Sequence, residues 1–145
     1  MKAEKSVSMQ HIVDVMHRHP VTVSPEADLS AVLDLFKKKY VETVAVVDEE
    51  NKLLGTVSTQ DCLHSLLQSS FYCGETPRVK EVMNTSYETV KPAESLLSLA
   101  QAMESSSVSA YMVMDGQRLV GSIFRKDVVQ LLRNELDHCS RSAHA

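Results

Sequence analysis

The chain has 145 residues, 43% of them hydrophobic and 23% charged, enough for one compact domain or for two small ones that share a core. Its formal charge is −4, and Lys and Arg are spread along the sequence, so neither nucleic acid nor an anionic membrane is an expected partner. We recognise no signal peptide and no apolar run of bilayer-spanning length, and therefore expect a cytoplasmic protein.

Three strands and two helices are predicted in the first half of the chain. Residues 20–23 form a short extended segment that closes at Ser24-Pro25, because proline stops a strand and suits the first position of a helix. Apolar residues then recur at helical spacing over residues 29–36, which predicts an amphipathic helix with Ser24 as its N-cap and Asp28 early in the helix. The apolar segments 44–48 and 53–57 flank a polar turn, which predicts a hairpin. A helix is expected from residue 60 to about residue 68.

The same elements return in the second half of the chain. Extended residues 87–90 precede a helical pattern over 96–103, apolar segments at 110–115 and 119–123, and a helix from residue 126 to about residue 136. Pro25 is matched by Pro92 at an offset of 67 residues, whereas Gly55 is matched by Gly121 at an offset of 66. The offset changes only in the polar turn of the hairpin, where an insertion is tolerated, so we infer a duplication.

The duplication defines the expected domain organisation. The copies occupy residues 10–68 and 77–133, with a linker at 69–76 and a flexible tail at 137–145 that lacks an apolar pattern. Each copy reads strand, helix, strand, strand, helix. The expected class is therefore α+β, with two repeats packed in pseudo-two-fold symmetry, because one copy alone buries too little apolar surface.

The repeated motifs resemble those of paired cystathionine-β-synthase (CBS) domains, also called Bateman modules. They are Asp14-Val15-Met16, Thr22-Val23, Pro25, Val46-Val47-Asp48 and Gly55-Thr56-Val57-Ser58-Thr59-Gln60-Asp61 in the first copy, and Glu81-Val82-Met83, Thr89-Val90, Pro92, Val113-Met114-Asp115 and Gly121-Ser122-Ile123-Phe124-Arg125-Lys126-Asp127 in the second. The resemblance implies a stand-alone CBS domain protein that binds AMP, ADP, ATP or S-adenosylmethionine in the cleft between its two repeats.

Asp61 is the first candidate for contact with such a ligand. An aspartate in the first turn of a helix can accept hydrogen bonds from the hydroxyls of a ribose, while unpaired N–H groups of that turn attract an anion. Ser58, three residues earlier, can contact ribose or phosphate through its hydroxyl. The same spacing also fits a capping box, in which Ser58 is the N-cap and Asp61 closes back onto it. Both interpretations stay open.

The resemblance carries further residues into two unequal sites. The first, which we expect to be occupied, comprises Arg18, Thr22, Val23, Val41, Glu42, Thr43, Ser58 and Asp61. The second comprises Thr89, Val90, Val108, Ser109, Ala110, Phe124, Arg125, Lys126 and Asp127. Phe124 departs from the motif because it lacks a hydroxyl, and it either stacks on a base or fills the site. Arg125 and Lys126 can hold phosphate oxygens, and Arg18 is either a phosphate contact or part of an exposed turn.

The resemblance implies a regulatory module that acts on a separate, unidentified protein partner and forms a homodimer. The alternative is a ligand-free scaffold for dimerisation or protein interaction. We do not expect an enzyme, since the chain shows no nucleophile elbow, Walker loop or glycine-rich dinucleotide turn. No metal site and no required cofactor are expected, because the three cysteines lack a Cys-x-x-Cys spacing and His17 and His19, two residues apart, lack a third ligand.

Overall fold

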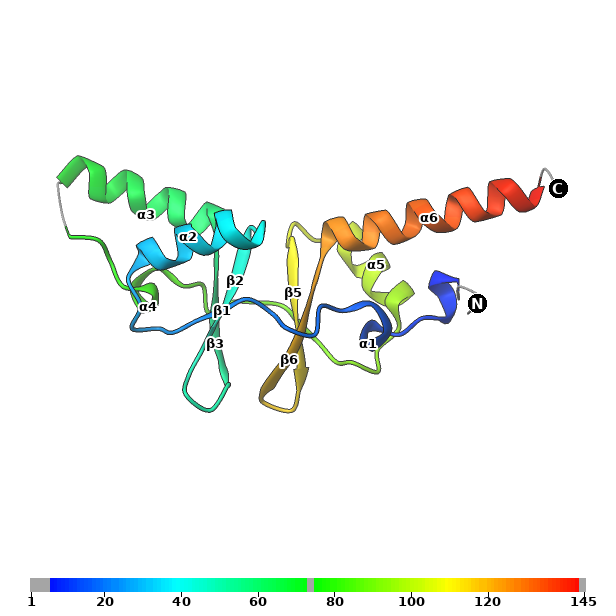
Figure 1. The fold of residues 1–145 in the computed structure, drawn as a ribbon, viewed down its shortest axis with the longest axis horizontal. Helices are drawn as coiled ribbons and strands as arrows, with labels where there is room; N and C mark the ends of the chain where they lie inside the picture. The colour runs from blue at the N-terminus through cyan, green and yellow to red at the C-terminus, as the bar shows by residue number, and fades with distance from the viewer. Residues whose placement is uncertain (1–5, 73–74, 144–145) are drawn as a thin grey trace. The chain divides into compact units, whose positions relative to one another are not determined.

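The computed structural model describes residues 6–72 and 75–143. The contacts within the chain divide it into two compact units (Figure 1). Among the described residues, unit 1 contains 6–18, 88–114 and 121–143, and unit 2 contains 19–72, 75–87 and 115–120. Each unit contains most of one three-stranded sheet together with helices, so the predicted α+β class with two similar halves is confirmed.

Unit 2 is built on a sheet of order β1-β2-β3. The strands are β1 (Thr22–Val23), β2 (Thr43–Val47) and β3 (Leu53–Ser58), with β1 parallel and β3 antiparallel to β2. Burial alternates along β3, as expected of a strand with one face in a core. The core joins this sheet to helices α2 (Leu29–Lys39) and α3 (Thr59–Tyr72). Its buried members are Leu29, Val32, Val44, Val46, Val57, Cys62 and Val79.

Unit 1 repeats this plan with the sheet order β4-β5-β6. The strands are β4 (Thr89–Val90), β5 (Ala110–Asp115) and β6 (Arg118–Phe124), and β4 pairs in parallel with β5. The helices α5 (Leu96–Glu104) and α6 (Arg125–Ala143) accompany this sheet. The order strand, helix, strand, strand, helix therefore occurs twice, as the sequence predicted.

Each repeat also begins with a short helix that the sequence patterns did not reveal. These helices are α1 (Ile12–Val15) and α4 (Val79–Val82), and a 3₁₀ turn, η1 (Val7–Met9), precedes α1. The helix α1 belongs to unit 1, where the amide of Ile12 donates to the carbonyl of Glu94 at 3.0 Å. In the same way α4 belongs to unit 2, where the amide of Val79 donates to the carbonyl of Ala27 at 2.9 Å. The leading helix of each sequence repeat thus packs in the unit built mostly from the other repeat.

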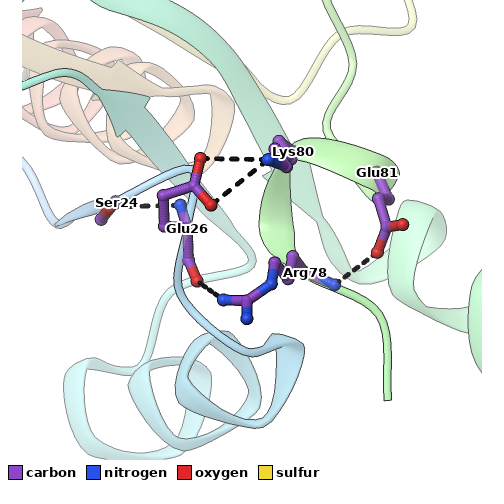
Figure 2. A network of polar contacts seen from close by, with 5 residues as sticks. All are labelled: Ser24, Glu26, Arg78, Lys80 and Glu81. Carbon is purple, nitrogen blue, oxygen red and sulfur yellow. Dashed lines mark hydrogen bonds and ion pairs between the residues drawn. The ribbon is translucent and has the colours of Figure 1, made fainter. Parts of the chain in front are cut away.

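A polar network holds α4 in unit 2 (Figure 2). The guanidinium of Arg78 donates to the carbonyl of Glu26 at 2.7 Å, and the ammonium of Lys80 lies 3.1 and 3.2 Å from the two carboxylate oxygens of Glu26. The amide of Glu26 donates to the hydroxyl of Ser24, and the amide of Arg78 donates to the carboxylate of Glu81. Side chains therefore reinforce the backbone contacts that attach the leading helix.

The predicted start of the first long helix was wrong. The structure makes Asp28, not Ser24, the N-cap of α2, with its carboxylate accepting from the amide of Ser30 at 2.8 Å. This bond holds the pKa of Asp28 below its ordinary value. Ser24 instead closes a turn by accepting from the amide of Glu26. The proline stops β1, but the helix begins only where a side chain satisfies its unpaired N–H groups.

Two helices also continue past their predicted ends. The expected linker at 69–76 is helical as far as Tyr72, where α3 ends, and the expected flexible tail from residue 137 is helical as far as Ala143. In α6 the residues after 136 lack the apolar period on which the prediction depended. Residues 73–74 and 144–145 of these stretches lie outside the described residues.

Candidate functional site

The junction of β3 with α3 brings Ser58 and Asp61 together. Oδ2 of Asp61 accepts from the amide and from the hydroxyl of Ser58, both at 2.9 Å, and the amide of Asp61 lies 3.3 Å from the Ser58 hydroxyl oxygen. This is the geometry of a capping box, so that interpretation of the spacing is confirmed. Ser58 therefore fixes the direction of the Asp61 carboxylate. Among the described residues, Oδ1 of Asp61 has no hydrogen-bond partner.

The segment before β2 reaches the same junction. The carbonyl of Glu42 accepts from the amide of Thr59, the first residue of α3, at 3.0 Å. Thr43 is opposite Ser58 in the register of β2 and β3 and is buried. Two of the residues expected near the ligand, Glu42 and Thr43, thus lie at this junction, and the side chain of Glu42 is exposed.

The other residues expected in the first site lie further from this junction or serve the core. Thr22 and Val23 form β1, which pairs with β2 on the side opposite β3. Val23 and Val41 pack against the core of unit 2, as ordinary apolar residues do. The guanidinium of Arg18 donates to the carbonyl of Val13 at 3.1 Å, a local contact within unit 1.

The close approach of a neighbouring backbone explains why the motif has glycine at positions 55 and 121. The backbone of Asn84 pairs with Thr56 in β3, at 2.8 and 3.0 Å, as the chain leaves α4. A Cβ atom on Gly55 would lie 2.8 Å from the carbonyl oxygen of Asn84, closer than two such atoms approach. Gly121 stands in the same relation to the carbonyl of His17. Each glycine therefore admits the strand-like segment that follows a leading helix.

The junction of β6 with α6 carries the equivalent aspartate in a different setting. Oδ2 of Asp127 accepts from the amide of Phe124 at 3.1 Å and lies 2.8 Å from Nε2 of His17. The imidazole of His17 also lies beside the Phe124 ring, with centroids 5.5 Å apart and an interplanar angle of 47°. Sequence reasoning missed this pair. His17 and Asp127 are far apart in the chain, and no local period connects them.

Arg125 is occupied by backbone groups. Its guanidinium donates to the carbonyls of Met103, Ser106 and Val108, at 2.9, 2.7 and 2.5 Å. We therefore do not include Arg125 among the residues proposed to contact a phosphate.

The remaining residues of the second site are spread over β4, β5 and α6. Thr89 and Val90 form β4, Val108 and Ser109 lead into β5, and Ala110 is its buried first residue. The ammonium of Lys126 lies 6.0 Å from the centroid of the Phe124 ring, at the limit of a cation–π contact.

Cysteine chemistry does not contribute to the first junction. Cys62 follows Asp61 and is a buried free thiol; burial, assisted by the negative charge of Asp61, raises its pKa to about 11. The thiol is therefore protonated at neutral pH and is a poor nucleophile. Cys139 is exposed, and Cys73 lies outside the described residues.

Residues 6–72 and 75–143 lack two kinds of feature. No helix there is both long and apolar enough to cross a bilayer. No three side chains of His, Cys, Asp or Glu in the same residues gather as a metal site would require.

Comparison with known proteins identifies the family. The CBS domain profile matches residues 12–68 and 79–134, which together make up most of the chain. The chain belongs to the CBS domain family. The resemblance inferred from the repeated motifs is thereby confirmed, and the two matched segments correspond to the two copies found by internal alignment.

Solved CBS structures share the fold over almost the whole chain. A Vibrio cholerae protein assigned provisionally to acetoin utilization (AcuB) is 32% identical, with a TM-score of 0.80, 92% of this chain and 97% of that chain covered. The CBS domain pair of protein MJ0100, solved with 5′-methylthioadenosine and S-adenosylmethionine, is 21% identical, with a TM-score of 0.77 and coverage of 87% and 98%. CBSX2, from Arabidopsis thaliana and solved with AMP, is 24% identical, with a TM-score of 0.75 and coverage of 86% and 96%.

Curated relatives are longer than this CBS chain. An uncharacterized protein of Methanocaldococcus jannaschii is 24% identical over 122 residues, which are 84% of this chain and 42% of that protein. An uncharacterized 33.4 kDa protein of Thermofilum pendens is 26% identical over 136 residues, 90% of this chain and 44% of that protein. The chain thus spans less than half the length of these relatives.

Proposed function

We propose that this CBS domain pair is a regulatory module that binds an adenosine-containing ligand at the junction of β3 with α3. Asp61 accepts hydrogen bonds from the ribose hydroxyls, and the adjoining segment of Val41, Glu42 and Thr43 lines the same site. The candidate ligands are AMP, ADP, ATP, S-adenosylmethionine and 5′-methylthioadenosine. Binding changes how the module acts on a separate protein partner.

One observation carries this proposal: Ser58 holds the Asp61 carboxylate in a fixed direction while Oδ1 has no partner among the described residues. A carboxylate positioned before the ligand arrives loses little conformational freedom on binding. It can therefore accept from ribose hydroxyls with the strength of a charge-assisted hydrogen bond. Two proteins of the same fold give further support, since MJ0100 was solved with adenosyl compounds and CBSX2 with AMP.

The test is isothermal titration calorimetry of the whole chain against the five candidate ligands, with the variant Asp61→Asn. An amide at this position keeps an oxygen for the Ser58 amide, so the helix start is retained while the charge is lost. We expect one ligand to bind with a stoichiometry of one per chain. The affinity of the variant for that ligand should be at least about tenfold lower, because a hydrogen bond to a charged group contributes about 1.5–3 kcal/mol.

Asp34→Asn is the matched control, because Asp34 is an exposed carboxylate on α2 in the same unit. Its affinity should equal that of the unmodified chain. The proposal fails if no candidate binds at millimolar concentration, or if Asp34→Asn and Asp61→Asn weaken binding equally.

We further propose that the chain forms a homodimer through α3 and α6. Both helices expose large apolar side chains at positions that correspond in the two repeats, Leu63 with Val129 and Leu66 with Leu132. Exposed apolar stripes of this kind favour burial against another surface. Sedimentation equilibrium at micromolar concentration should give twice the chain mass, and Leu132→Glu should shift it toward the monomer. An unmodified chain that sediments as a monomer contradicts the proposal.

The same exposed side chains favour the alternative function, a scaffold that dimerises and docks another protein without a ligand. The titrations above distinguish the two functions. A homodimer that binds none of the five ligands is the result that the scaffold predicts.

A further inference from the structure

The aspartate of each junction is held through one carboxylate oxygen. Oδ2 of Asp61 accepts from the amide and from the hydroxyl of Ser58, both at 2.9 Å. Oδ2 of Asp127 accepts from the amide of Phe124 at 3.1 Å and lies 2.8 Å from Nε2 of His17. Among the described residues, Oδ1 of neither aspartate has a hydrogen-bond partner. Each carboxylate therefore presents one open oxygen, although one motif has a serine and the other a phenylalanine.

The side-chain donor to each aspartate comes from a different part of the chain. At the junction of β3 with α3 it is the Ser58 hydroxyl, which belongs to the motif itself. At the junction of β6 with α6 the motif has Phe124, which carries no hydroxyl, and the donor is the imidazole of His17. Because an ionised carboxylate only accepts, Nε2 is the ring nitrogen that carries the proton in this bond. His17 thus supplies the hydrogen bond that a serine at position 124 would supply.

Backbone and ring contacts hold His17 in this place. Its amide donates to the carbonyl of Ser122 at 2.8 Å and the Ser122 amide donates back at 3.0 Å, which fixes His17 beside the end of β6. Its ring lies against that of Phe124, with centroids 5.5 Å apart and an interplanar angle of 47°, within the range of favourable aromatic pairs. The residue that lacks the hydroxyl therefore supports the residue that replaces it.

The corresponding residue of unit 2 has another role. Asn84 follows His17 at the offset of 67 residues, and its backbone pairs with β3 as that of His17 pairs with β6. Its side chain, however, accepts from the amide of Ser86 at 2.8 Å and is not among the donors to Asp61. Among the described residues, the leading segment therefore supplies a donor at the junction whose motif lacks one, and not at the other.

We propose that His17 is a positioning residue, which orients Asp127 so that Oδ1 accepts from the ribose of an adenosine-containing ligand at the junction of β6 with α6. This inference rests on the function proposed above, because it gives Asp127 the role that Asp61 has there. The chain then has a second ligand site despite the phenylalanine in its motif. This site has the lower affinity, because the His17 side chain is 52% exposed and loses more conformational freedom than a serine does when it is fixed.

The experiment uses Asp61→Asn as the background, so that the binding measured is that of the second junction. Calorimetric titrations of this whole chain with AMP, S-adenosylmethionine and 5′-methylthioadenosine should show residual, weaker binding. Adding Asp127→Asn should remove it, which assigns the residual binding to Asp127. Adding His17→Ala instead should lower its affinity by about twofold to tenfold, because the ligand must then order the carboxylate.

A further substitution separates positioning from a merely structural role. Phe124→Ser, added to His17→Ala in the same background, returns a hydroxyl to the motif and should recover most of the lost affinity. His19→Ala, at an exposed histidine two residues along the chain, is the matched control and should leave the affinity unchanged. Circular dichroism melts verify that the variants are folded.

Three results overturn the inference: no probe binds the Asp61→Asn chain at millimolar concentration, Asp127→Asn leaves the residual binding unchanged, or a folded His17→Ala variant binds as well as its background. A loss in His17→Ala that Phe124→Ser does not recover also contradicts it, because the hydroxyl then fails to replace the imidazole. Failure of the proposed function has a different signature, in which Asp61→Asn leaves the affinity of the first site unchanged.

Discussion

At the scale of single residues, Arg125 shows how a charged side chain in a repeated motif can serve the fold. The last turn of a helix leaves carbonyl groups without intrahelical partners. Arg125 donates to the carbonyl of Met103 in the last turn of α5 and to those of Ser106 and Val108 in the segment that follows. One guanidinium thus fixes the path of the chain from α5 into β5.

We predict that Arg125→Ala lowers the free energy of unfolding by about 2 kcal/mol, since it removes charge-assisted hydrogen bonds to partly buried carbonyls. Arg125→Lys should recover only part of this loss, because an ammonium does not match the planar guanidinium geometry. Urea unfolding followed by circular dichroism measures both. Arg133→Ala, at an exposed position of α6, is the control and should change stability by less than about 0.5 kcal/mol. If Arg133→Ala lowered the free energy of unfolding as much as Arg125→Ala, the stabilising role assigned to Arg125 would be contradicted.

The same residues explain which parts of the site were predictable. Ser58 and Asp61 are three residues apart, and local spacing was enough to propose their capping geometry. His17 and Asp127 are 110 positions apart, and they meet only because α1 packs in unit 1. The role of Arg125 depends on the path of residues 103–108. Composition and periodicity do not encode such long-range contacts.

At the scale of elements, the motif glycines connect each hairpin to a leading segment. The segment after α4 pairs with β3 at Thr56 and Asn84, and the segment after α1 pairs with β6 at Ser122 and His17. Both pairings require a residue without Cβ in the adjoining strand. The repeated Gly is therefore a signature of packing, and the capping contacts of the next helix begin three residues later at Ser58.

We predict that Gly55→Ala destabilises the chain by about 1–3 kcal/mol, because the new methyl group meets a backbone carbonyl that cannot rotate away. Gly121→Ala should have a similar effect through the carbonyl of His17. Thermal unfolding by calorimetry measures both. Gly116→Asn is the control: Gly116 has φ +64 with open space around its Cα, and Asn tolerates this conformation. A loss in the control as large as in Gly55→Ala would contradict the steric explanation.

The ends of the helices were harder to predict from the sequence than the helices themselves. The apolar period located α2, α3, α5 and α6, but it did not locate their termini, because capping and polar continuation determine where a helix stops. Asp28 in place of Ser24 as the N-cap of α2 is one example, and the extension of α6 to Ala143 is another.

At the scale of the whole molecule, the sequence repeats and the compact units do not coincide. The sequence repeat begins at α1, but α1 contributes to unit 1, while α4 completes unit 2. Val79 of α4 is fully buried among the core residues of unit 2. Removing α4 therefore opens the core of the first repeat, whereas removing α1 leaves that core intact.

Because each leading helix packs in the unit built mostly from the other repeat, we can predict how fragments of the chain fold. A fragment of residues 19–87 keeps α4 and its core contacts, so we expect a cooperative urea transition by circular dichroism. A fragment of residues 12–68, the segment that matches one family repeat, lacks α4 and keeps α1 without its partners in unit 1. We expect it to unfold gradually, because a small domain with an opened core retains too little buried apolar surface.

A third fragment, residues 19–76, isolates the contribution of α4, since it differs from the first only by the segment that contains this helix. It should resemble the 12–68 fragment and not the 19–87 fragment. If 12–68 unfolds as cooperatively as 19–87, the sequence repeat is itself the folding unit, and α4 adds a contact without completing the core. If only 19–87 is cooperative, the folding unit is the one defined by contacts, and the duplicated sequence is displaced from it by one short helix.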